Sequence, residues 1–152
     1  MARRFVHDHL PYLLARASHA LWRGFEPQVR AAGLNSLEWR VLATLYDGEP
    51  ESVGRLALEV LAKQPTVTKT LDRLGAQGWV ERSADPGDAR RSRVRITAAG
   101  RRHVAPLVQA AMKHERERLR ALGGARGVQM QALRQQLALL VERFDEEEPR
   151  AG

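Results

Sequence analysis

Apolar residues recur at helical spacing along the N-terminal part of the chain. This pattern predicts an amphipathic helix over residues 5–31. Its apolar face consists of Leu10, Leu14, Ala17, Leu21 and Phe25. Pro11 fits the first turn, whereas Pro27 is expected to kink or end the helix and Gly33 to close it.

Two further amphipathic helices are predicted at the C-terminal end. Thr97 can cap the first, which extends to about Leu122 and is broken at Gly123-Gly124. The apolar face of the second consists of Leu133, Leu137, Leu140, Val141 and Phe144. The central part of the chain is too small to cover both of these apolar faces and the apolar face of the first helix. We therefore expect a homodimer that buries them between two copies.

The central segment contains a helix followed by two short helices. Asn35 or Ser36 can cap the first of these three, whose inward residues are Leu37, Val41, Leu42 and Leu45. Ser52 can cap the next, whose apolar face consists of Val53, Leu56, Ala57, Val60 and Leu61. The third helix begins at Gln64-Pro65 and ends at Gly78. Its buried stripe is formed by Val67, Leu71 and Leu74.

Two strands are predicted after these helices, at Trp79–Arg82 and Arg93–Ile96, around a loop over residues 83–92. The order of elements indicates a mainly α fold, a winged helix-turn-helix with a small β-hairpin wing. Residues 35–100 would form a DNA-binding region. Residues 1–34 and 101–148 would form a helical dimerisation region.

The positive charge of the chain is concentrated in this central region. The net charge is +7, and residues 61–102 hold ten Lys and Arg against four Asp and Glu. A concentrated excess of this kind is typical of a surface that binds a polyanion such as DNA.

Several classes of function find no support in the sequence. The chain has no cysteine, which excludes disulfides, thiolate metal sites and thiol switches. No nucleophile–base pair, phosphate-binding glycine loop or carboxylate pair indicates an enzyme or a cofactor. The histidines His7, His9, His103 and His114 do not have the spacing of a compact metal site. Without an apolar run of about 20 residues or a signal core, we expect a cytoplasmic protein with no membrane partner.

The second short helix carries candidate DNA-reading residues on its exposed side. They are Gln64, Pro65, Thr66, Thr68, Lys69 and Arg73. Small residues allow a close approach to base edges, hydroxyl groups can contact bases or phosphates, and Lys69 can reach guanine or a phosphate. An ordinary solvated helix face is the alternative.

The predicted hairpin is rich in arginine. Arg90, Arg91, Arg93 and Arg95 lie within six residues, and arginine suits insertion into a narrow minor groove. Asp88, two residues before Arg90, could hold that guanidinium in an extended pose. The alternative is a charged, solvated hairpin in which Asp88 only forms the turn.

These segments resemble the multiple-antibiotic-resistance regulator (MarR) family. The resemblance rests on Gly33-Leu34 through Leu45, on Pro65-Thr66-Val67-Thr68-Lys69, and above all on Asp85-Pro86-x-Asp88-x-Arg90-x-x-x-Val94-x-Ile96-Thr97-x-x-Gly100. It implies a dimeric transcription factor that binds pseudo-palindromic operators in double-stranded DNA and usually represses. It also implies that Arg90 is the wing-tip arginine, that Asp88 orients it, and that Arg82 sits near the DNA backbone at the base of the wing.

Many members of the family release DNA when a small phenolic or aromatic-acid effector binds. In this chain His9 and Arg16 lie seven residues apart on one side of the first helix, where Arg16 could anchor a carboxylate. Trp22 and Trp39 could supply aromatic walls. Alternatively, Arg16 pairs with an acid across the dimer and the tryptophans belong to the core.

A second function remains open from the sequence alone. A winged helix can also serve as an interaction module that binds protein, or nucleic acid without sequence preference. Such a module would bind DNA weakly, with equal affinity for all sequences and a strong dependence on salt.

Overall fold

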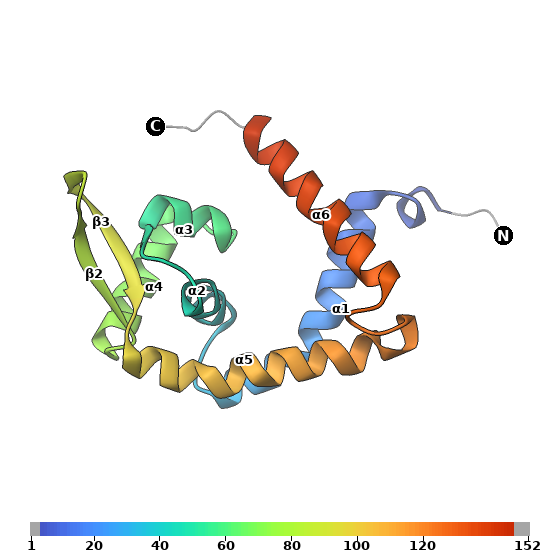
Figure 1. The fold of residues 1–152 in the computed structure, drawn as a ribbon, viewed down its shortest axis with the longest axis horizontal. Helices are drawn as coiled ribbons and strands as arrows, with labels where there is room; N and C mark the ends of the chain where they lie inside the picture. Colours follow the sequence, from blue (N-terminus) through green and yellow to red (C-terminus); the bar gives the residue numbers. More distant parts are fainter. Residues whose placement is uncertain (1–3, 148–152) are drawn as a thin grey trace. The chain divides into compact units, whose positions relative to one another are not determined.

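A computed structural model describes residues 4–147, except for the side chains of residues 89–91 and 145–147. These residues form six α-helices, two 3-10 helices and a three-stranded antiparallel sheet (Figure 1). The chain divides into two compact units, Met1–Ala111 and Met112–Gly152. No helix within the described range is long and apolar enough to cross a membrane. The mainly α winged-helix fold predicted from the sequence is confirmed.

The N-terminal helix begins later than predicted and ends at the predicted residue. Phe5–His7 form a separate 3-10 helix, η1, and α1 begins only at Leu10, with Pro11 in its first turn. The helix does not end at Pro27 but continues to Ala31. Val29, two residues beyond the proline, is completely buried, and this packing offsets the backbone hydrogen bond that proline removes. Gly33 follows the end of the helix in a left-handed conformation, as predicted.

Helix α2, Ser36–Tyr46, begins with the predicted asparagine cap. The Asn35 Oδ1 atom accepts hydrogen bonds from the amides of Leu37 and Glu38. The Glu38 carboxylate accepts one from the Asn35 amide at 2.8 Å, which completes a capping box. This reciprocal arrangement sets the direction in which α2 leaves the preceding turn.

The core of the first unit joins α2, α3 (Val53–Glu59), α4 (Gln64–Ala76) and the sheet. Fully buried side chains come from each of these elements and from α5 (Ala98–Leu119), namely Val41, Leu42, Leu45, Leu56, Val67, Leu71, Leu74, Val94 and Val104. Ser52 caps α3 by accepting a hydrogen bond from the Arg55 amide. For α2, α3 and α4, these positions are the ones that the helical periodicity assigned to the interior.

Leu61 is an exception to that periodicity. It was predicted on the apolar face of the first short helix, but α3 ends before it, and its side chain is 83% exposed. Its φ angle is +54°, and the amide of Ala62 donates to the carbonyl of Ala57 at 3.0 Å. This is the geometry of a helix stop that usually uses glycine, and it turns the leucine side chain outward.

The hairpin is longer than predicted. Strands β2, Val80–Asp85, and β3, Asp88–Ile96, pair almost to the tip, which leaves Pro86-Gly87 as the turn in place of a loop over 83–92. Backbone pairing continues through polar residues that carry no apolar signal. A third strand, β1 (Glu51–Ser52), pairs with β3 and was too short to be predicted. In Figure 1 the hairpin extends beside α4, with its tip away from the start of α5.

The start of α5, Ala98–Leu119, is fixed against the base of the hairpin. The Thr97 hydroxyl donates to the Gly78 carbonyl at 2.6 Å and accepts from the Gly100 amide at 3.0 Å. A Cβ atom on Gly100 would lie 2.1 Å from the Trp79 carbonyl oxygen, so only glycine fits there. This close contact connects the hairpin rigidly to the first turn of α5.

The second unit contains the end of α5, the 3-10 helix η2 (Arg120–Leu122) and α6 (Val128–Glu147). The predicted break at Gly123-Gly124 is present, and both glycines are left-handed. Apolar side chains of α6 that were expected to be covered by a partner are exposed in the single chain, among them Leu133 at 47%, Val141 at 61% and Phe144 at 59%.

Candidate nucleic-acid interface

Helix α4 presents two distinct faces. Its inward face consists of Val67, Thr70, Leu71 and Leu74, all buried. Thr70 is the polar member of this face, and its hydroxyl donates to the Thr66 carbonyl at 3.0 Å, which satisfies it without a tertiary partner. The outward face carries the predicted DNA-reading residues. Gln64, Pro65, Thr66, Lys69 and Arg73 are exposed, and Thr68 is half-buried.

Arg73 has a partner within the protein. Its guanidinium lies 3.0 Å from the Glu38 carboxylate, the same side chain that caps α2. Glu38 therefore bridges the start of α2 and the later part of α4. Lys69, one turn earlier on α4, has no ion pair with any residue that the structure describes. Its positive charge is thus the more available of the two.

Arg82 on β2 points back toward α4. Its Nη2 atom lies 2.7 Å from the Asp72 carboxylate and donates to the Thr68 carbonyl at 3.3 Å. Arg82 was predicted to lie near the DNA backbone at the base of the wing. Its contacts within the chain join the base of the wing to α4, and its predicted place near the DNA backbone stays a prediction.

Asp85 organises the tip of the wing. One of its oxygens accepts from the Gly87 amide at 2.8 Å, and the other accepts from Arg93 Nε at 2.6 Å. The hydrogen bond from Arg93, followed by that from the Gly87 amide, lowers the pKa of the Asp85 carboxyl below its usual value. The same pairing raises the pKa of Arg93. Arg93 also donates to the Pro50 carbonyl, which ties β3 to the segment before β1.

The third described arginine of the wing is paired as well. Arg95 lies opposite Glu81 in the strand register, and Arg95 Nε donates to its carboxylate at 2.5 Å. Arg82, Arg93 and Arg95 therefore all contact carboxylates of the same chain. Arg90 and Arg91 belong to β3, but the structure does not describe their side chains. Asp88 is exposed beside the turn, and its predicted role toward Arg90 stays a prediction.

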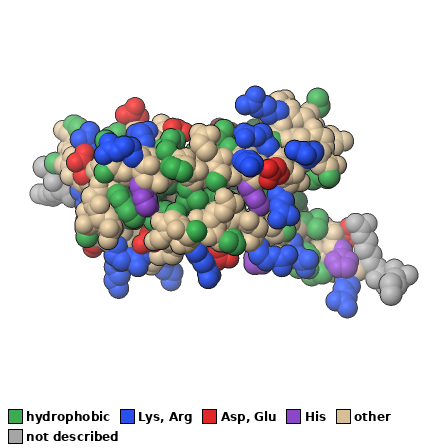
Figure 2. Space-filling view, turned by 90° about the horizontal axis from the view of Figure 1, so that it is seen from below, with side chains coloured by type: hydrophobic (Ala, Val, Ile, Leu, Met, Phe, Trp, Pro, Cys, Tyr) green, Lys and Arg blue, Asp and Glu red, His purple; other side chains and the backbone are tan. Residues whose placement is uncertain are grey.

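Sequence reasoning missed the acidic partners Glu38, Asp72 and Asp85. The pair Glu81–Arg95 follows from the register once the turn is placed at Pro86-Gly87. No local signal links Asp72 to Arg82, because these residues approach only when the hairpin folds back along α4. On the face drawn in Figure 2, Lys and Arg side chains are nevertheless prominent and acidic side chains few, as the net charge of +7 leads one to expect.

The candidate effector residues fall into two groups. Trp22 and Trp39 both pack edge-on against Phe25, with ring centroids 6.2 and 5.4 Å away, and both are partly buried against the core. Arg16 lies over the Tyr12 ring and donates to its hydroxyl at 3.3 Å. His9 precedes α1 and contacts the Phe5 ring at 5.0 Å.

Arg40 is a further candidate that sequence reasoning did not include. Its Nε atom is buried and has no hydrogen-bond partner among the described residues. An unsatisfied buried donor costs about 1–3 kcal/mol, so a bound acceptor at this position would be favoured. The sequence does not show this burial, because the burial of a single guanidinium nitrogen depends on packing.

Comparison with known proteins identifies the fold. Residues 34–92 match the model of the MarR family. The crystal structure of a MarR family transcriptional regulator from Silicibacter pomeroyi DSS-3 is 39% identical, with a TM-score of 0.77, and the match covers 91% of this chain and 99% of that one. The chain belongs to the MarR family. It has the winged-helix DNA-binding fold of that family, formed by α3, α4 and the β2–β3 hairpin.

Two repressors are similar to this MarR family chain, one in sequence and the other in fold. The HTH-type transcriptional repressor IacR from Pseudomonas putida is 30% identical over 93 residues, which make up 61% of this chain and 56% of IacR. The chain thus spans little more than half the length of this curated relative. The transcriptional repressor CouR, solved bound to a 23-mer DNA duplex, shares the fold at 23% identity, with a TM-score of 0.73 and coverage of 93% of this chain and 99% of CouR.

Proposed function

We propose that this protein is a homodimeric transcriptional repressor that binds a pseudo-palindromic operator in double-stranded DNA with sequence specificity. Residues 35–100 form its DNA-binding region, and residues 1–34 and 101–148 its helical dimerisation region. The observation that carries the proposal is the exposed polar face of α4 beside an arginine-rich hairpin in a MarR family fold.

In this proposal α4 enters the major groove with its N-terminal half. Gln64, Pro65 and Thr66 are exposed there, and their small or hydrogen-bonding side chains suit contact with base edges. Lys69 follows with a charge that no described carboxylate neutralises, so it reaches guanine or a phosphate. Arg73 contributes less, since Glu38 already holds its guanidinium.

The wing reaches the flanking minor groove with Arg90, which Asp88 orients, and with Arg91. Arg93 and Arg95 are expected to have a structural role and not to insert into the groove, since Arg93 pairs with Asp85 and Arg95 with Glu81. These pairs stiffen the two strands and leave the arginines near the tip as the candidates for insertion. A stiff hairpin loses less conformational freedom when it binds, and this favours affinity.

A second copy of the chain covers the apolar faces of α1 and α6. Leu10 and Leu21 of α1 are 50% and 40% exposed, and Val141 and Phe144 of α6 are 61% and 59% exposed. Large apolar side chains at this density are typical of an interface between subunits. The two-fold axis of such a dimer matches operator half-sites about one helical turn apart.

A small aromatic acid is the proposed effector. Trp22 and Trp39 supply aromatic surface around Phe25, and Arg16, His9 and the unsatisfied Arg40 are candidates for its carboxylate. The effector acts by favouring a separation of the two DNA-binding regions that does not match the operator. This is a shift between populations of conformers and involves no chemical step.

The test is fluorescence anisotropy of the purified protein on its own upstream DNA, with a scrambled fragment alongside, at near-physiological salt. We expect a preference of about a thousandfold or more for the upstream DNA. Sedimentation at the same concentrations is expected to give twice the mass of the chain. Equal, salt-sensitive binding to both fragments and to neighbouring promoters would instead support a non-specific interaction module.

A further inference from the structure

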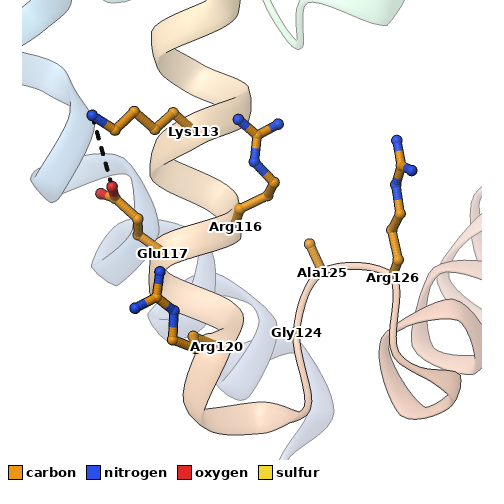
Figure 3. Close-up of a pocket in the computed structure, with 7 residues that line it drawn as sticks. All are labelled: Lys113, Arg116, Glu117, Arg120, Gly124, Ala125 and Arg126. Carbon is orange, nitrogen blue, oxygen red and sulfur yellow. Dashed lines mark ion pairs between the residues drawn. The ribbon is translucent and has the colours of Figure 1, made fainter.

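The second unit contains a strongly basic cavity at the turn between α5 and α6. Its volume is about 420 Å³, within the range of sites for small molecules. Lys113, Arg116 and Arg120 line it from α5 and η2, and Arg126 lines it from the loop. Glu117 is the one acidic residue among those that line it. Figure 3 shows Arg116 and Arg126 on either side of the space next to Ala125.

The loop that closes this cavity is held in place by contacts of its own. Arg134 of α6 donates to the Ala125 carbonyl through one nitrogen and pairs with the Glu115 carboxylate of α5 at 2.9 Å through the other. The Gly124 amide donates to the Leu119 carbonyl at 2.9 Å. Ala125 is buried as a result. The positions of Arg116 and Arg126 are therefore defined by a fixed backbone on both sides.

The cations around the cavity are mostly without an acidic partner. Lys113 and Glu117 form a long pair at 3.9 Å. Arg116, Arg120 and Arg126 have no carboxylate partner among the described residues. Arg116 and Arg120 are four residues apart on the helical surface, a spacing at which like charges repel. The dipole at the end of α5 favours cations there, but it does not account for Arg126, which lies outside the helix.

We propose that this cavity binds a small oxyanion that carries two or more negative charges. Guanidinium groups donate pairs of parallel hydrogen bonds to carboxylate or phosphate oxygens, and two of them, Arg116 on α5 and Arg126 on the loop, flank the space beside Ala125 (Figure 3). A ligand with a single charge would leave most of this positive charge uncompensated. The site is separate from the residues assigned above to DNA and to the aromatic effector, and the proposal does not depend on either assignment.

The experiment is isothermal titration calorimetry of the full chain with citrate, pyrophosphate and acetate, each at the same ionic strength. We expect binding of citrate or pyrophosphate at one site per chain, at least tenfold tighter than acetate. The ratio of the first two affinities distinguishes a polycarboxylate ligand from a phosphate ligand. Absence of binding by both multiply charged anions would overturn the proposal.

Variants decide whether the anion occupies this cavity. Arg116→Gln combined with Arg126→Gln is expected to weaken binding at least tenfold, and Arg116→Lys with Arg126→Lys to restore it only in part, because lysine lacks the planar fork. Arg118→Gln, on the same helix but not lining the cavity, is the matched control and should change affinity less than twofold. Thermal melting verifies that each variant is folded.

Two results would assign the cations to another partner and overturn the proposal. Equal loss in Arg118→Gln and in the double Gln variant would indicate diffuse attraction to the whole surface. A double Gln variant that binds the anions normally but loses affinity for DNA or for its own second copy would place these arginines at a macromolecular interface.

Discussion

Arg82 on β2 and Asp72 on α4 form an ion pair with an N–O distance of 2.7 Å, and the same Arg82 nitrogen donates to the Thr68 carbonyl. The pair is partly exposed, with 38% of the arginine side chain and 62% of the aspartate side chain accessible, so it contributes little to stability. Its effect is geometric. It joins the wing to α4, the helix that is proposed to enter the major groove.

The first prediction separates this positioning role from a phosphate contact. Asp72→Asn removes a negative charge from the region that is proposed to bind DNA, and this change alone would strengthen binding. If Arg82 positions the wing, we expect both Asp72→Asn and Arg82→Ala to weaken operator binding by up to about fivefold, equivalent to ~1 kcal/mol. The slope of log affinity against log salt should stay unchanged.

The measurement is anisotropy on the operator at several salt concentrations. A tighter complex for Asp72→Asn, together with a slope smaller by about one for Arg82→Ala, would show that Arg82 contacts a phosphate directly.

The second prediction compares two cations on α4. Lys69→Ala is expected to weaken operator binding about tenfold, because no described carboxylate neutralises Lys69. Arg73→Ala should cost only about twofold, since Glu38 holds its guanidinium at 3.0 Å. Binding isotherms on operator and scrambled DNA check both values. A larger loss for Arg73→Ala than for Lys69→Ala would contradict this order.

The third prediction concerns the effector. Arg40→Ala and Arg16→Ala should raise the concentration of benzoate or 4-hydroxybenzoate that releases DNA by about tenfold, the effect of losing one charged hydrogen bond. Operator affinity without effector should change less than twofold. Arg23→Ala, exposed on the same helix as Arg16, is the control. If all three variants respond like the wild type in a release assay, neither arginine is the anchor.

The fourth prediction follows from the lowered pKa of Asp85. Its folded-state pKa lies below the unfolded value of about 3.9, so the stabilisation from the Asp85–Arg93 pair is present at neutral pH. It is lost as the pH falls below about 4 through the folded-state pKa. The Arg93 Nε–H resonance should therefore move in acid in the wild type and not in Asp85→Asn. The same acid transition in both proteins would mean that another group causes it.

The fifth prediction compares two helix ends with left-handed backbones, one occupied by a leucine and the other by a glycine. Leu61 and Gly78 both have left-handed backbones, with φ angles of +54° and +71°. Leu61→Gly relieves strain at an exposed position and should raise the free energy of unfolding by about 1 kcal/mol. Gly78→Ala should lower it by a similar amount. Urea denaturation at one fixed protein concentration measures both, and a loss of stability in Leu61→Gly would show that the exposed leucine has a packing role.

Short-range patterns in the sequence were sufficient for much of the fold. The caps at Asn35 and Ser52 form as predicted, because a capping side chain bonds to amides two or three residues away. The inward residues of α4 and the alternation of Val94 and Arg95 also follow from local periodicity. The family resemblance could also be recognised from the sequence, because the motif from Asp85 to Gly100 is a single continuous segment.

The tertiary structure decided what depends on residues far apart in the sequence. Pro27 lies inside α1 because Val29 is buried in the core, and Leu61 faces solvent because its backbone is left-handed after α3 ends. Most of all, the structure decided which of the described arginines pair with carboxylates of the same chain. Composition counts every guanidinium equally, but Arg82 meets Asp72 and Arg73 meets Glu38 only after the helices and the hairpin pack, since an ion pair depends on distance in space and not on separation along the chain.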